Sequence, residues 1–324
     1  MSHELTIHKS GRVEMAYAAG EVPWHSLGTA LPRDASPEEW LKVAGLDWKI
    51  QRSFVRFNDD DGVQHKSETD VVLFRNDTKA KLGIVSSDYK VVQPSQLMDV
   101  FADLAKNAGL KIETAGTLFG GKQFWVAAKV NDGAKVAGED IVCPYVLMHS
   151  SCDGSSRTSA RFTGIRPVCY NTVSAALGAA KATFAVSHRS KFSPEAAKAV
   201  LAAANVHFAA YVEAARALTK VRLTNSAAEQ FYVKLLAEQL GTKEEKAVRE
   251  SKAFKRILRL FTTSALGGTL LSAEGTAWGA VNAVTEYVDH DRSRSTLDHT
   301  VWNGWFGPGD KLKTAALTQA LELV

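Results

Sequence analysis

Residues 111–130 read KIETAGTLFGGKQFWVAAKV, and this stretch decides the fold class of the first half of the chain. Two runs of strand-forming residues, Lys111–Leu118 and Gln123–Val130, flank the turn residues Gly120 and Gly121. Two such runs joined by a short glycine turn predict an antiparallel β-hairpin. The run Phe119–Lys122 resembles a phosphate-binding loop only superficially, because the second half of that motif is missing.

The sequence on the N-terminal side of the hairpin adds more strands and one helix. Residues of alternating type and turn residues predict strands over Ile50–Phe57, Asp70–Arg75 and Leu82–Val85. The segment Pro94–Asn107 has apolar residues at helical spacing and is followed by Gly109, which predicts a helix that ends there.

The hydrophobic period changes after Cys169. Before it, Ile141–His149 and Arg161–Val168 have the character of strands. After it, helices are predicted over Asn171–Thr183, Pro194–Lys220, Thr224–Leu240, Lys243–Phe261, Gly275–Asp289 and Asp310–Leu323. Strands followed by helices predict an α+β fold, with an antiparallel sheet in residues 48–168 covered by helices from 171–323.

No low-complexity linker separates the two halves of the chain. We therefore expect a β-rich part, residues 1–170, and a helical part, residues 171–324, to share one core. The segment Asp291–Gly309 is predicted to be a mobile loop. Its aromatic residues, Trp302, Trp305 and Phe306, are expected to hold that loop on the body, with base stacking as the alternative.

Composition excludes several classes of protein. Of the 324 residues, 45% are hydrophobic and 23% are charged, which is unlike a disordered, collagen-like or coiled-coil chain. No run approaches the ~18 apolar residues of a membrane-spanning helix, and the first residues lack the pattern of a secretory signal. Three cysteines exclude a disulfide framework, so we expect a reducing compartment, the cytoplasm.

Positive charge is concentrated in the middle of the chain. Residues 1–150 carry a net charge of −3, residues 151–262 carry +10, and residues 263–324 carry −3. Such an asymmetry favours an anionic partner, most often a nucleic acid. The alternative is a set of helices with solvated basic faces.

The strongest local cluster of polar residues lies in residues 149–172. Hydroxyl groups, small residues and the arginines Arg157, Arg161 and Arg166 suit phosphate oxygens. Asn171 or Thr172 is expected to cap the following helix, whose N-terminus would favour an anion. A polar hairpin with an ordinary helix cap is the alternative.

The predicted helix over residues 243–261 has a basic stripe. At ~100° per residue, Arg249, Lys252, Arg256 and Arg259 fall on one side and apolar residues on the other. The basic residues His188, Arg189 and Lys191 precede the long alanine-rich helix. We predict that the stripe faces the same groove as the three arginines, although a solvated surface explains it nearly as well.

Metal and enzyme signatures are weak. His149, Cys152 and Asp153 are close in sequence, but the paired spacings of common zinc sites are missing, and Cys143 and Cys169 are expected to be small apolar core residues. His290 and His299 lie among acidic residues, where an exposed loop explains them better than a metal site. No nucleotide-binding or nucleophile motif is present, so we predict no cofactor, no metal and no assigned catalytic residue.

Several motifs together resemble one family. They are Pro23–Gly28, Asp88–Gln93, Ser150–Ser155, Arg166–Thr172, Gly275–Trp278 and Asn282–His290. In these segments, which include the motif residues Asp153, Cys169, Asn171 and Thr172, the chain resembles the phage- and plasmid-like proteins built on the domain of unknown function 932. The resemblance implies a setting of mobile DNA and suggests a role like that of phage single-strand annealing proteins, which form rings or filaments. It assigns no catalytic residue.

Three functions remain open from the sequence. The first is an oligomeric protein that binds or anneals single-stranded nucleic acid, single-stranded DNA above all. The second is an enzyme, with or without a metal, that acts on nucleic acid or on a nucleotide and is built around His149, Asp153 and Arg157. The third is an inhibitor of a host defence factor that never touches DNA. We expect the first, with no membrane partner, because the basic middle segment and the missing nucleoside-triphosphatase motifs agree with it.

Overall fold

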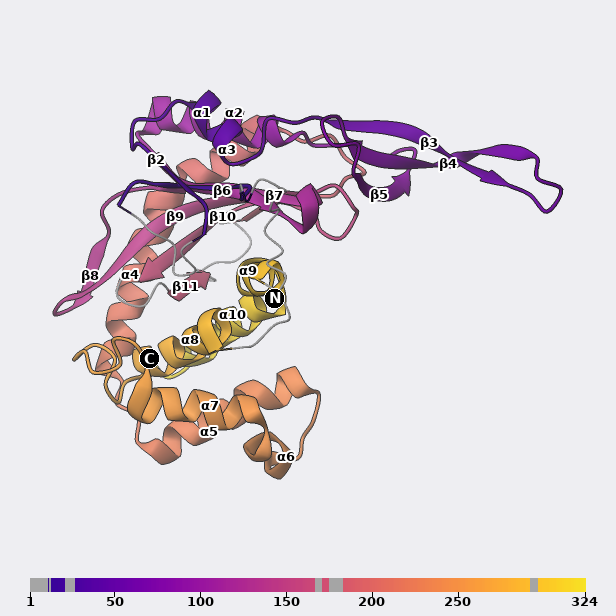
Figure 1. Ribbon diagram of the computed structural model, residues 1–324. Helices are drawn as coiled ribbons and strands as arrows, with labels where there is room; N and C mark the ends of the chain where they lie inside the picture. Colours follow the sequence, from indigo (N-terminus) through magenta and orange to yellow (C-terminus); the bar gives the residue numbers. More distant parts are fainter. Residues whose placement is uncertain (1–10, 12, 21–26, 167–170, 175–182, 292–296) are drawn as a thin grey trace. The chain divides into compact units, whose positions relative to one another are not determined.

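The structure is a computed structural model that describes residues 11, 13–20, 27–166, 171–174, 183–291 and 297–324. Strands lie in the first half and helices dominate the second, so the α+β prediction is confirmed (Figure 1). The chain divides into two compact units, each built from three stretches. Unit 1 comprises Met1–Val130, Val146–Arg161 and Thr183–Ala202; unit 2 comprises Asn131–Tyr145, Phe162–Ala182 and Ala203–Val324.

Unit 1 holds most of the strands. Its elements are β1 (Met15–Ala18), β2 (Thr29–Leu31), α1 (Pro37–Val43), β3 (Ile50–Asn58), β4 (Gln64–Arg75), β5 (Lys81–Ser86), α2 (Pro94–Ala108), β6 (Lys111–Leu118), η1 (Phe119–Gly121), β7 (Gln123–Lys129), part of β9 (Asp140–Ser151), part of β10 (Thr158–Arg166), β12 (Thr183–Val186) and α3 (Pro194–Ala202). Within unit 1 the strands of the larger, nine-stranded sheet follow the order β10-β9-β7-β6-β1-β2, β12 also pairs with β10, and β1 runs parallel to β2. Strands β3, β4 and β5 form a separate antiparallel sheet.

The local signals in the sequence explain the centre of unit 1. The predicted hairpin forms from β6 and β7, whose last pair before the turn is Leu118 with Gln123. Helix α2 starts at a proline and ends where Gly109 takes a left-handed φ of 68°. Its apolar stripe, which includes Phe101, is buried and packs on β6 and β7.

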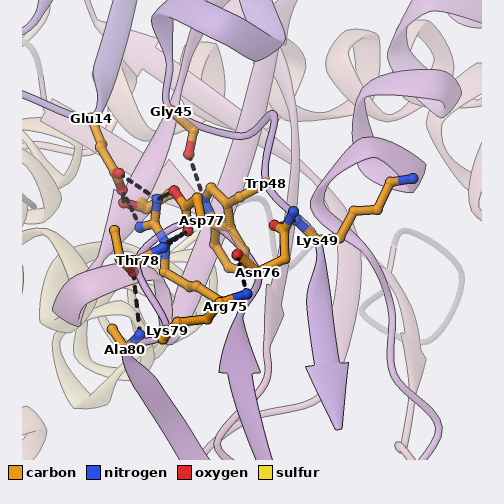
Figure 2. A network of polar contacts seen from close by, with 11 residues as sticks. Glu14, Gly45, Trp48, Lys49, Arg75, Asn76, Asp77, Thr78, Lys79 and Ala80 are labelled. Atoms are coloured by element: carbon orange, nitrogen blue, oxygen red, sulfur yellow. Dashed lines mark hydrogen bonds and ion pairs between the residues drawn. The ribbon is translucent and has the colours of Figure 1, made fainter.

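A buried ion-pair network holds the end of β4 in unit 1 (Figure 2). The Arg75 guanidinium donates to both carboxylate oxygens of Glu14, at 2.9 and 2.8 Å, and to the carboxylate of Asp77. Its plane lies over the ring of Trp48, 4.4 Å from the centroid. Thr117 on β6 also donates to Glu14, at 2.6 Å. The network therefore links the β3-β4-β5 sheet to the larger sheet through charges that satisfy one another.

Unit 2 is mainly helical. Its elements are β8 (Ala134–Ala137), the remaining parts of β9 and β10, β11 (Asn171–Ser174), α4 (Ala204–Lys220), α5 (Asn225–Leu240), α6 (Glu245–Glu250), α7 (Lys252–Arg259), η2 (Leu260–Ser264), α8 (Ala277–Glu286), η3 (Tyr287–Asp291), α9 (Leu297–Trp305) and α10 (Pro308–Leu321). Helix α4 packs on β8 and on α8, and every residue of α8 is buried. Buried Asp140 accepts from the indole N–H of Trp278, at 2.9 Å, and from Ser272, at 2.6 Å. This carboxylate ties β9 to the central helix of the unit.

The predicted helix over Asn171–Thr183 is wrong where the structure describes it. Residues Asn171–Ser174 form β11 against the second half of β10, and Thr183–Val186 form β12 against its first half. Residues 175–182 lie outside the described residues. Pairing along β10 satisfies its backbone N–H and C=O groups, and this long-range gain outweighs the local helix preference of the sequence.

Two other predicted helices are divided. The long helix becomes α3 and α4, on either side of Ala203. The segment Lys243–Phe261 becomes α6 and α7, because Ser251 is extended (φ −62°, ψ 146°) and its hydroxyl caps α7 by accepting from the Phe254 N–H. The predicted loop Asp291–Gly309 contains helix α9, so it is not a loop where the structure describes it, and residues 292–296 lie outside the described residues. Trp302 and Trp305 at the end of α9, and Phe306 just after it, are half-buried. Among the helices of the described residues, none is long and apolar enough to cross a membrane.

Candidate nucleic-acid interface

A tight turn connects β9 to β10 in unit 1. The Asp153 carboxylate accepts from the backbone N–H of Ser155 at 2.9 Å and from its hydroxyl at 2.5 Å. Ser151 closes the turn by donating to the Ser156 carbonyl at 2.8 Å, while the Ser156 N–H donates back to the Ser151 hydroxyl. These side-chain bonds order the polar residues that precede Arg157.

A chain of hydrogen bonds runs from this turn into the sheet. The imidazole of His149 meets the carbonyl oxygen of the Gln123 side chain at 3.1 Å, and the Gln123 amide donates to Ser155 at 3.0 Å. Ser155 in turn donates to Asp153, so every donor in the chain is directed towards that carboxylate. Burial, helped by the positive charge of Arg161, lowers the pKa of His149 to about 3. His149 is therefore neutral and is a poor base near neutral pH.

The cysteine in this cluster is structural. The Cys152 thiol is buried and donates to the carbonyls of Gly121 and Lys122. Burial and the nearby Asp153 raise the pKa of Cys152, so the thiol stays protonated. Cys143, in unit 2, is buried as predicted.

An aromatic pair holds the segment after β12 against β9. The rings of Tyr89 and His188 stack with centroids 4.4 Å apart and planes 13° apart. The Tyr89 hydroxyl donates to the Ser151 carbonyl at 3.0 Å. His188 Nδ1 donates to the Lys90 carbonyl at 3.0 Å, while the Lys90 N–H donates to the His188 carbonyl. Burial lowers the pKa of His188, so this predicted cation is a neutral, buried ring that stacks on Tyr89.

Four exposed cations gather at this end of unit 1, and we call them the basic end: Lys90, Arg157, Arg189 and Lys191. Arg157 immediately precedes Thr158, which pairs with Val186 at the end of β12. Arg189 follows in a turn closed by a bond from the Ser190 N–H to the Ser187 carbonyl. Lys90 is joined to the same turn through His188. Among the described residues, none of the four forms an ion pair, so their charge is available to an external anion.

Unit 2 contains a second basic surface, on α7. Lys252, Lys255, Arg256 and Arg259 are spaced as i, i+3, i+4 and i+7 and share one face, while Phe254 and Ile257 are buried on the other. Lys252, Lys255 and Arg259 are exposed. Arg249 does not belong to this stripe, because it lies on α6 beyond the break at Ser251.

Two of the predicted cations in unit 2 have acidic partners. Arg256 donates twice to Asp291, with N···O distances of 2.6 and 3.0 Å. Arg249 donates to Glu229 at 2.6 Å and lies near the ring of Phe254. Their positive charge is thus partly neutralised within unit 2, and they are weaker candidates for phosphate contacts than the exposed Lys252 and Lys255 of α7.

The remaining predicted residues are not gathered at the basic end. Arg161 pairs with Thr183 at the far end of the β10–β12 ladder, and it is half-buried. The backbone of Arg166 pairs with that of Asn171, and Thr172 pairs with Ile165, so Asn171 and Thr172 are strand residues and do not begin a helix. Cys169 lies outside the described residues. The groove expected to join these arginines to α7 remains a prediction.

The acidic residues near His290 take part in ion pairs. Asp289 and Lys313 form a buried pair at 2.7 Å, and Asp291 binds Arg256. In the part of the chain that the structure describes, no group of three or more His, Cys, Asp or Glu residues is placed to hold a metal ion.

Sequence reasoning missed Tyr89, Lys90, Gln123 and Lys255. Tyr89 and Lys90 stand in the motif Asp88–Gln93, which was noted only for its resemblance and not for its chemistry. Gln123 carries no local signal, because its role depends on β7 lying beside β9. Lys255 joins the stripe once the register of α7 is known.

The model of one family matches the chain over residues 81–306, which is more than two thirds of its length. That family is described as "Domain of unknown function (DUF932)", and the match runs from the start of β5 to just past the end of α9. No curated protein and no solved structure matches the chain. The chain therefore belongs to the DUF932 family, as its motifs had indicated.

Proposed function

We propose that this protein binds single-stranded nucleic acid through the basic end of unit 1. The observation that carries the proposal is the set of four exposed cations, Lys90, Arg157, Arg189 and Lys191, which have no acidic partner among the described residues. They come from three segments distant in sequence, and hydrogen bonds and a ring stack fix those segments beside one another. Phosphate groups are the anions that arginine and lysine clusters bind most often.

The chemistry of the site favours binding over turnover. His149 is neutral and buried, and the thiol of Cys152 is protonated, so neither supplies a base or nucleophile near neutral pH. The turn at Asp153–Arg157 is held by its own hydrogen bonds, which fix Arg157 in place for contact with a phosphate backbone. A backbone-directed site of this type is tolerant of base sequence.

The biological setting is the second part of the proposal. We place the protein on phage or plasmid DNA, where it would hold single strands and bring them together for annealing. Annealing requires two strands to be presented together, which is achieved by several copies on one strand, and we therefore propose that the protein self-associates.

A charge-reversal variant tests the binding site. Arg157→Glu, Arg189→Glu and Lys191→Glu together should weaken binding to all single-stranded oligonucleotides alike. The slope of log K against log salt should flatten by about 2, because each phosphate neutralised on a single strand contributes about 0.7. Fluorescence anisotropy over a salt series measures both quantities.

The matched control reverses three exposed lysines elsewhere in unit 1, Lys49, Lys106 and Lys111, and so changes the net charge equally. This control should bind almost as wild type does. Equal losses in both variants would mean that net charge alone attracts the oligonucleotide. Wild-type protein that binds no oligonucleotide at low salt would refute the proposal and favour the inhibitor of a host factor, while turnover of the oligonucleotide would favour the enzyme.

A further inference from the structure

The sheet β3-β4-β5 has an apolar face on each side. Val71, Leu73 and Val85 point to the buried side. On the other side, Val72 pairs with Ile84 and Phe74 lies two residues further along β4. An antiparallel sheet with one face in solvent normally has polar residues there. Ile84 is instead 54% exposed, and Val72 and Phe74 are only half-buried.

This outer face continues along the ribbon that β3 and β4 form beyond β5 (Figure 1). Val55 follows Ser53, the partner of Val72, on the same side of β3, and Phe57 is 55% exposed further on. Two strands alone are marginally stable in water, and a large exposed apolar patch marks an interaction site. We propose that the outer face, defined by Val55, Phe57, Val72, Phe74 and Ile84, docks on the same face of a second copy of this chain.

The charges around the outer face decide which partner it takes. The stretch 51–70 holds three basic and five acidic residues, so it repels a nucleic acid. Asp70 and Lys81 stand at opposite ends of the three-stranded part of the outer face, because Asp70 shares its side with Val72, and Lys81 pairs with Phe74. A twofold axis across the strands places Asp70 of one copy over Lys81 of the other. The face is thus complementary to itself, in charge as well as in apolar surface.

Edge-to-edge pairing of the ribbons is disfavoured by the same residues. The pairing of β3 and β4 is irregular between Phe54 and Arg56, and Ser67 accepts from the backbone N–H groups of Thr69 and Asp70. Bulges and charges of this kind block an edge from pairing with another chain. The two copies are therefore expected to associate through the outer faces of their sheets and not through their strand edges.

The inference deepens the proposal of self-association, on which it rests, but it is independent of nucleic-acid binding. The test is the mass of the full chain by light scattering, without nucleic acid and over a range of concentrations. Wild type should have twice the 35.1 kDa chain mass, or an even multiple of it. Ile84→Glu should halve that mass. Phe54→Glu is the matched control, since Phe54 is also exposed but lies on the other side of the ribbon, and it should leave the mass unchanged.

Exchanging the charges of Asp70 and Lys81 tests how the two copies are oriented on one another. Lys81→Glu puts an acid opposite Asp70 and should weaken association at least tenfold, and adding Asp70→Lys should restore it. A wild-type mass of 35.1 kDa at every concentration would overturn the proposal and leave oligonucleotide binding by the basic end untouched. An associated Ile84→Glu variant, or a double variant no better than Lys81→Glu, would show that another surface joins the copies. Circular dichroism confirms that each variant is folded.

Discussion

At the scale of single residues, the burial of neutral His149 makes the folded protein less stable at acidic pH. His149 has a pKa of about 3 in the folded protein, chiefly because burial disfavours its charged form, against 6.5 in the unfolded chain. Between these values the unfolded chain binds a proton that the folded protein does not. Stability is therefore lost as pH falls from 6.5 towards 3, by about 1.4 kcal/mol per pH unit for this one group.

We predict that His149→Gln flattens this dependence. Glutamine keeps a donor for the Gln123 carbonyl but does not titrate, so the variant should lose less stability than wild type over the same interval. Urea unfolding at a series of pH values gives the free energy of unfolding of each protein. In the difference between wild type and variant, the contributions of the carboxylates that both proteins share cancel. Parallel curves for the two proteins would mean that His149 is protonated in the folded state.

At the scale of elements, one serine divides a helix. Ser251 ends α6 and caps α7, and its hydroxyl accepts from the Phe254 N–H at 3.1 Å. Ser251→Ala removes this cap and should lower the free energy of unfolding by about 1 kcal/mol. Ser251→Asp, which also caps helices well, should recover most of the loss, and the midpoints of urea unfolding compare the three proteins. If alanine stabilised the protein, a continuous helix over 245–259 would be the better description.

At the scale of the whole molecule, we predict that the basic end and the exposed residues of α7 both take part in binding single strands. The basic end has four cations. If each neutralises one phosphate, the slope of log K against log salt concentration on single strands should be about −2.8, at about 0.7 for each phosphate. If the exposed residues of α7 contact the same strand, the slope becomes about −4.9.

Replacing Lys252, Lys255 and Arg259 by Glu separates the two cases. We expect both surfaces to take part, as the concentration of charge in residues 151–262 indicates, so the variant should flatten the slope by about 2. Short oligonucleotides provide the control, since a strand that reaches only the basic end should bind both proteins alike. An unchanged slope on long strands would leave α7 as a solvated face.

Much of the fold was determined by signals close together in the sequence. The glycine turn predicted the β6–β7 hairpin, and the apolar period with Gly109 predicted α2 and its end, because turns and amphipathic faces depend on neighbouring residues. The concentration of basic charge was likewise visible in the composition. Arg157, Arg189 and Lys191 are exposed in the structure, but their predicted contact with nucleic acid stays a prediction, and nothing in the sequence placed them together.

Only the tertiary structure decided the rest. Residues Asn171–Ser174 are a strand because β10 has backbone groups to satisfy, and the neighbouring residues do not encode that partner. Lys90 reaches the basic end because it pairs with His188, 98 residues away. The burial that makes His149 neutral and the ion pairs that neutralise Arg249 and Arg256 are also long-range. Charge and period are properties of the chain, whereas pairing, burial and neutralisation depend on which distant segments meet.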